Sequence, residues 1–238
     1  MTTVSLDTRK KDLLKALVSE YVRTAAPVGS VTLVQKHGFD LSSATIRHEL
    51  GALEELGLIE QPHTSAGRIP TERGFRTYVD LVISREASAA KTKAKIRLPQ
   101  ADSDPEAAVK SVAKHVAEQA QEAVLVAFAP RHIYYTGVSH LFSQPEFQEY
   151  GRVVRFSELI DRLDDIVGDI FPRVKDETLV WIGQENPFGN LCGTVIVRCP
   201  VASKKFGVLG ILGPMRMDYE RCYGLLNLTR QMLAGAFG

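Results

Sequence analysis

The chain has 238 residues, of which 24% are charged and 45% hydrophobic, and a formal net charge of +1 at pH 7, which is typical of a globular protein. No apolar run reaches the roughly 18 to 20 residues of a membrane-spanning helix, and the polar N-terminus lacks the pattern of a signal peptide. We therefore expect a cytoplasmic protein, without membrane association, made of one large or two small domains.

The charge is unevenly distributed along the chain. Residues 1–97 contain 15 Lys and Arg against 11 Asp and Glu, a net charge of +4, whereas residues 98–238 carry a net charge of −3. The N-terminal part is therefore the better candidate to bind a polyanion such as nucleic acid, through charges placed on one face. Three cysteines without a Cys-x-x-Cys pair favour reduced thiols over a disulfide framework or a zinc ribbon.

Two helices are predicted first. Apolar residues repeat at helical spacing from Asp7, the expected N-cap, to Thr24. Pro27 and Gly29 then interrupt the pattern. Ser30 is expected to cap a short second helix, and Gly38 to end it.

A third helix is predicted after Ser42, which is its expected N-cap, and it stops at Gly57. Its apolar face consists of Ile46, Leu50, Leu53 and Leu56. The opposite face begins with small or hydrogen-bonding side chains, in the turns where a helix in the DNA major groove makes its contacts: Ser42, Ser43, Thr45, Arg47 and His48. By itself, the same pattern is also typical of an ordinary amphipathic surface helix.

A β-hairpin wing is predicted next, from two short extended pieces at residues 58–61 and 69–71 around a polar loop. The loop residues expected to contact DNA are Thr64, Ser65, Gly67 and Arg68. Gly67 would allow a close backbone approach at the tip, and the Arg68 guanidinium would bind a phosphate. Thr71 is expected to cap a further helix. The order of elements predicts a winged helix-turn-helix DNA-binding domain over residues 1–85.

The remaining chain predicts a linker over residues 86–104 and an α+β domain over residues 105–238. Asp104 and Pro105 begin a clean helix, and Asp218 caps the last one. Between them we expect strands at residues 123–129, 133–137 and 178–183, one amphipathic helix at residues 156–170, and a hairpin of residues 194–201 and 206–212.

Several runs resemble the heat-inducible transcription repressor HrcA family. In the N-terminal part they are residues 27–30, 41–47, 53–57 and especially 61–71, and in the C-terminal part residues 141–147, 182–187 and 207–219. The resemblance implies a C-terminal domain similar to the GAF fold. It also implies a homodimeric repressor of heat-shock (chaperone) genes that binds double-stranded DNA at an inverted-repeat operator and depends on the GroEL chaperonin. His48 stands where the family usually has an asparagine, so the family's operator sequence does not carry over base for base.

The resemblance also implies a missing segment. Family members are longer and carry an inserted dimerisation segment between the pieces that correspond here to residues 129–130 and 135–137. This short form would have to dimerise through its sheet domain or its last helix. We also expect the apolar strands at residues 124–128 and 208–212 to be less covered than in longer relatives, and so to suit a chaperonin.

The sequence contains no arrangement of residues typical of a catalytic site. His132, His140 and Cys192 lack the spacing of metal ligands, so we expect no enzyme activity, no metal and no cofactor. Two classes of function remain open. One is a sequence-specific DNA-binding repressor, and the other is a winged-helix regulator whose GAF-like domain senses a small-molecule ligand.

Overall fold

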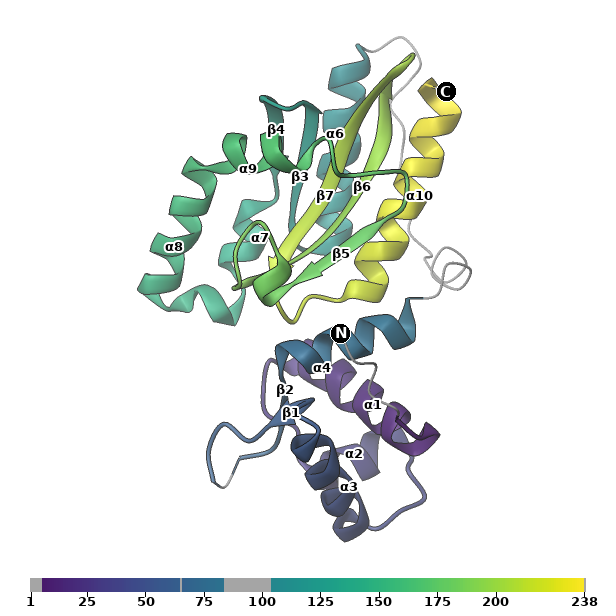
Figure 1. Cartoon of the computed structure of the whole chain (residues 1–238), viewed down its shortest axis with the longest axis vertical. Helices are drawn as coiled ribbons and strands as arrows, with labels where there is room; N and C mark the ends of the chain where they lie inside the picture. The colour runs from purple at the N-terminus through teal and green to yellow at the C-terminus, as the bar shows by residue number, and fades with distance from the viewer. Residues whose placement is uncertain (1–5, 65, 84–103, 238) are drawn as a thin grey trace. The chain divides into compact units, whose positions relative to one another are not determined.

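The computed structural model describes residues 6–64, 66–83 and 104–237, which form two compact units, Met1–Val82 and Ile83–Gly238. Each unit is described by itself below (Figure 1). The predicted linker lies outside the described residues, apart from Asp104.

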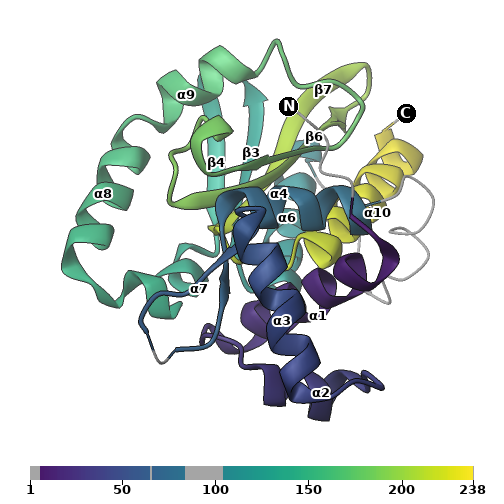
Figure 2. The ribbon, with the colours of Figure 1, turned by 60° about the horizontal axis from the view of Figure 1, so that its bottom comes forward.

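The first unit contains four helices and a two-stranded antiparallel sheet. In chain order these are α1 (Thr8–Thr24), α2 (Ser30–His37), α3 (Ser43–Glu55), β1 (Ile59–Glu60), β2 (Ile69–Pro70) and α4 (Glu72–Val82). Figure 2 shows α3 beside α2, with the loop between β1 and β2 projecting from the same unit. This is the element order of a winged helix-turn-helix. We call residues 61–68 the wing loop.

Local capping accounts for most of the helix ends in this unit. The side chain of Asp7 accepts a hydrogen bond from the Lys10 amide, and that of Ser42 from the Thr45 amide, as predicted. Gly38 and Gly57 end their helices with φ of +65° and +69°, where glycine has no steric cost.

The prediction that Ser30 caps α2 is wrong. Gly29 is the N-cap, with extended backbone and no side-chain hydrogen bond, and Ser30 is already the first helical residue, with its side chain buried. The helix starts here because a backbone bridge between Val28 and Arg68 fixes the chain just before Gly29.

Buried aliphatic and aromatic side chains hold α3 in place. Those contributed by α3 are Ile46, Leu50 and Leu53, which are buried with residues of the other elements of the unit: Leu13, Leu14, Leu17, Val18, Leu33, Leu58, Ile59, Phe75 and Val79. Each such side chain contributes about 1.5–3 kcal/mol by its removal from water. Because this face of α3 is committed to the core, the opposite face is turned outward.

The second unit is a five-stranded antiparallel sheet with helices on both faces. Its elements are α6 (Pro105–Ala120), β3 (Ala123–Ala129), β4 (His132–Thr136), α7 (Val138–Phe142), η1 (Pro145–Gln148), α8 (Tyr150–Asp161), α9 (Leu163–Ile170), β5 (Leu179–Ile182), η2 (Gly183–Glu185), β6 (Cys192–Ala202), β7 (Lys205–Pro214) and α10 (Tyr219–Phe237). The strand order is β4-β3-β7-β6-β5. Helices α6 and α10 pack on one face of the sheet, and α8 and α9 lie on the other side (Figure 1). The predicted α+β class is confirmed.

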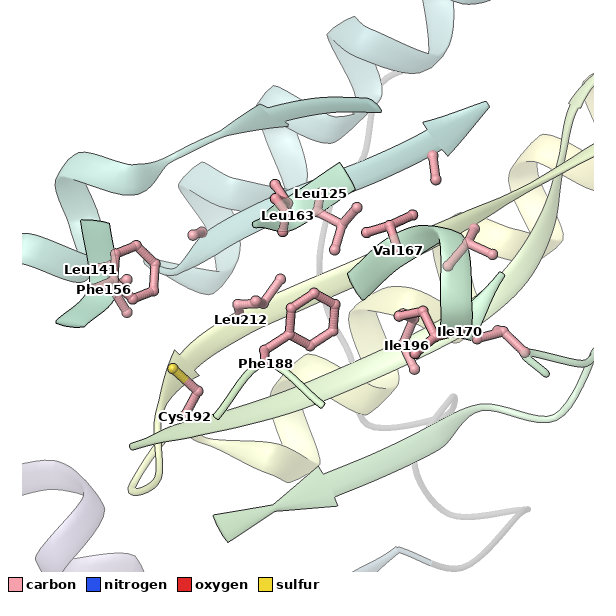
Figure 3. Packing of buried hydrophobic residues seen from close by; sticks show 14 of the residues in the cluster. Leu125, Leu141, Phe156, Leu163, Val167, Ile170, Phe188, Cys192, Ile196 and Leu212 are labelled. Atoms are coloured by element: carbon pink, nitrogen blue, oxygen red, sulfur yellow. The ribbon is translucent and has the colours of Figure 1, made fainter. Parts of the chain in front are cut away.

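Two expectations for this unit are wrong. The single helix at residues 156–170 is two helices, α8 and α9, separated at Arg162. The break allows α9 to bury Leu163, Val167 and Ile170 in the core, while Phe156 anchors α8 (Figure 3).

The second wrong expectation concerns the cover over the central strands. The hydrophobic residues of 124–127 and 208–212 are at most 5% exposed, because helices cover both faces of the sheet. Within residues 124–127 and 208–212 these strands therefore expose almost no apolar surface, whereas Phe128 is half-buried and Phe206, at the start of β7, is 47% exposed.

Candidate nucleic-acid interface

The outward face of α3 is most exposed at its first turns. Ser42, Ala44, Arg47 and His48 are exposed, whereas Ser43 and Thr45 are half-buried. The Ser42 hydroxyl accepts from the Thr45 amide at 3.1 Å and lies 2.9 Å from the Thr45 hydroxyl. Ser42 thus also caps the helix that carries both predicted contact residues.

Arg47 and His48 have exposed side chains that are available for contacts with another molecule. Neither makes a side-chain hydrogen bond or ion pair with another described residue. The nearby acidic residue of α3, Glu49, is half-buried and paired with α1, at 3.4 Å to Arg9 and 3.3 Å to Lys10. Its charge is therefore compensated within the unit, which leaves Arg47 as the cation at the exposed start of α3, with the exposed Asp40 two residues before the N-cap.

The wing loop is shaped by side chains within it. The Gln61 side-chain amide donates to the Thr64 and Ala66 carbonyl oxygens, both at 2.9 Å. Thr64 and His63 are exposed. Ser65, a predicted contact residue, lies outside the described residues.

Gly67 and Arg68 lie at the base of the wing loop and not at its tip, contrary to the expectation. The amide and carbonyl of Arg68 bond to those of Val28 at 2.9 Å each. A Cβ on Gly67 would lie 2.5 Å from the Val28 carbonyl carbon and oxygen. The close approach that this glycine permits is therefore to the protein's own backbone.

Part of the Arg68 side chain is also bound within the unit. Its Nε donates to Oε2 of Glu54 on α3 at 2.9 Å, which leaves the two terminal nitrogens of the fork for other acceptors. The wing base is thus attached both to the turn before α2 and to α3.

A buried carboxylate that the sequence analysis missed joins α1 to α2. Glu20 accepts from Arg23 at 2.6 Å and from Lys36 at 2.7 Å, and these two cations lower the pKa of Glu20 to about 2. An acidic residue within the apolar stripe of the first helix, three residues after Leu17, was the signal for it. Lys36 is consequently paired within the unit, although its side chain is exposed.

The described residues contain no group of three or more His, Cys, Asp or Glu side chains placed to hold a metal ion. Burial raises the pKa of the Cys192 and Cys199 thiols to about 12, so neither is a nucleophile at neutral pH. In the described part of the chain, no helix is long and apolar enough to cross a membrane.

Comparisons with known proteins agree on one family. Residues 82–222 match the family described as "HrcA protein C terminal domain". The chain is 57% identical over 82 residues to the heat-inducible transcription repressor HrcA of Natranaerobius thermophilus, a stretch covering 34% of this chain and 24% of that protein. It is 28% identical over 331 positions to the HrcA of Thermoanaerobacter sp. strain X514, covering 96% of each chain.

The second of these relatives is longer than this chain. The alignment extends over 331 positions, whereas 96% of this 238-residue chain is about 228 residues. About 100 positions of that relative thus have no counterpart here.

One solved crystal structure shares the fold. It is titled as a hypothetical protein and superimposes with a TM-score of 0.77 at 18% identity, covering 98% of this chain and 97% of that one.

Proposed function

Because the chain belongs to the HrcA family of heat-inducible transcription repressors, we propose that its first unit binds duplex DNA through α3 and the wing loop. The residues proposed to contact DNA are Ser42, Ser43, Thr45, Arg47, His48, Thr64, Ser65, Gly67 and Arg68. The observation that carries the proposal is the exposed pair Arg47 and His48, free of partners among the described residues on a helix whose other face is buried.

Arg47 is proposed to be the main base contact. An arginine projecting from a helix in the major groove can donate two hydrogen bonds to the O6 and N7 atoms of a guanine. His48, on the same turn, would donate to or accept from an adjacent base edge. Ser42 and Ser43, at the helix N-terminus, would meet a phosphate together with the free backbone amides there.

Gly67 and Arg68 are assigned a supporting role at the wing. Their backbone is fixed against Val28, so the proposed contact is made by the terminal nitrogens of the Arg68 fork with a phosphate. Such a contact adds affinity without base preference. Thr64, exposed in the wing loop, would accompany it.

A homodimer on an inverted repeat is the proposed DNA-bound form. α3 has only 13 residues, and a single short helix reads too few base pairs for useful specificity. Two copies related by a two-fold axis double the site and match an inverted repeat. The second unit is the proposed dimerisation unit.

The proposed targets are heat-shock (chaperone) genes, and the proposed further partner is the GroEL chaperonin. Family membership supports both proposals. The buried central strands of the second unit add no support for chaperonin binding. Loss of the folded DNA-binding form on heating would then release the genes.

A binding selection from random DNA duplexes with the full chain tests the proposal. We expect enrichment of an inverted repeat, with a dimer in solution by sedimentation. No enrichment over the starting pool would contradict DNA recognition, and enrichment of a single half-site by a monomer would contradict the dimeric arrangement.

A further inference from the structure

A cavity of about 270 Å³ lies within the second unit, between α8, α9 and the loop that leads into β6. It is lined by Phe147, Phe156, Leu159, Ile166 and Phe188, with Arg155, Glu158, Arg162 and the loop residues 187 and 189–192 around them. Ligand-binding cavities are typically about 300–1,000 Å³, and this one, just below that range, has room only for a small organic molecule.

The aromatic side chains of the cavity wall pack against one another. The rings of Phe147 and Phe156 meet edge-to-face with centroids 5.6 Å apart, and Phe142 packs against Phe156 in the same way at 5.5 Å. Figure 3 shows Phe156 and Phe188 within the core cluster between the helices and the sheet. An apolar group that enters the cavity therefore meets side chains already held in position.

The loop on the other side is fixed by a buried asparagine. The Asn186 side-chain amide donates to the Cys192 carbonyl at 2.8 Å and lies 3.0 Å from the Thr194 hydroxyl. Its oxygen accepts from the Phe188 amide at 3.1 Å. This network holds Phe188 against the cavity without any ligand, so binding would need little reorganisation.

The charged side chains of the cavity lining carry a net charge of +1, from Arg155 and Arg162 against Glu158. Arg155 and Arg162 are exposed, and neither makes an ion pair with another described residue; Arg155 only donates to the Gly151 carbonyl, at 3.3 Å. Glu158 is the single acidic residue of the lining. Arg152, on the same helix but outside the cavity, is by contrast paired with Glu149 at 3.0 Å.

We propose that this cavity binds a small amphipathic carboxylate, with its ring or branched chain among the phenylalanine side chains and its carboxylate on Arg155 and Arg162. Guanidinium groups bind carboxylates through paired, charge-assisted hydrogen bonds. The apolar lining selects against small inorganic anions, which would leave it empty. The proposal concerns the second unit alone and does not depend on DNA binding.

The test is calorimetric titration of the full chain with phenylacetate at millimolar concentrations, compared with uncharged phenylacetamide. We expect phenylacetate to bind and to raise the unfolding temperature, and the amide to bind at least about tenfold more weakly. Absence of phenylacetate binding, or equal affinity for the amide, would overturn the proposal.

Variants assign the binding to this cavity. Arg155→Ala with Arg162→Ala should lower phenylacetate affinity at least about tenfold, whereas Arg152→Ala, on the same helix, should leave it unchanged. Leu159→Trp, which keeps both arginines, should block binding by filling the cavity. Binding retained in both the double variant and Leu159→Trp would place the ligand elsewhere and contradict the proposal.

Discussion

Nε of Arg68 donates to Oε2 of Glu54 at 2.9 Å, which attaches the base of the wing loop to the last turns of α3. The two side chains are 20% and 36% exposed, and an ion pair of this kind contributes only about 0.2–1 kcal/mol to stability. Its main consequence is geometric. Together with the Val28–Arg68 bridge, it fixes the wing relative to the helix proposed to enter the groove.

Arg68→Ala and Glu54→Ala both break this ion pair, but only the first removes a cation from the proposed interface. We expect Arg68→Ala to weaken binding to all duplexes about equally, by roughly 1 kcal/mol, and to reduce the salt dependence by about one charge. Glu54→Ala should keep or increase the affinity, because it removes a negative charge while the Val28–Arg68 bridge still holds the wing base. Affinities of both variants, measured over a salt series, check this; equal losses in the two would mean that Arg68 only positions the wing.

Gly67→Ala should destabilise the first unit by about 1–3 kcal/mol, because the added Cβ would overlap the Val28 backbone. Gly51→Ala on α3 is the matched control, since nothing lies within 4 Å of its Cβ. Replacing a glycine inside a helix should stabilise by about 0.5–1 kcal/mol. Chemical denaturation of the two variants gives the comparison, and a loss of stability in both would contradict the packing at Gly67.

Local features were predictable from the sequence, and contacts between distant residues were not. Asp7 and Ser42 were identified as caps, and Asp104 as the start of a helix, because a cap bonds to an amide only three residues away. β3 was predicted over its observed residues, since a continuous apolar run of strand length is also a local signal. The pairing of Arg68 with Glu54 joins positions 14 residues apart, so no local pattern placed Arg68 at the wing base.

The two errors in helix boundaries have the same origin. Ser30 is a good capping residue by type, but the bridge from Val28 to Arg68 makes Gly29 the N-cap. Residues 156–167 contain neither glycine nor proline, so nothing in the local sequence marked the break at Arg162. The break follows from packing both helices onto the sheet.

Stability should depend on pH through Glu122, which is 6% exposed and whose Oε2 has no hydrogen-bond partner among the described residues. Burial raises the pKa of this carboxyl from 4.5 to about 8. The folded state therefore keeps a proton that the unfolded state releases. The stabilisation from this proton is full below about pH 4.5 and is lost as the pH rises to about 8; thermal unfolding over this range measures it.

Glu122→Gln should remove that dependence. The amide stays neutral, so the variant should gain stability over the parent as the pH rises, by on the order of a few kcal/mol above pH 8. Glu118→Gln on α6 is a control, because Glu118 is exposed. Parallel curves for Glu122→Gln and the parent from pH 5 to pH 9 would show that Glu122 is ionised in the folded protein.

The most direct test of DNA recognition by α3 is a random-duplex selection with the parent and Arg47→Ala in parallel at matched salt. Lys15→Ala, which removes one positive charge from α1, is the control. We expect the parent and Lys15→Ala to enrich the same inverted repeat. Arg47→Ala should lose the preference for one guanine in each half-site, at a cost of about 1–3 kcal/mol on the parent's site. Identical base preferences and affinities for Arg47→Ala and the parent would contradict the account.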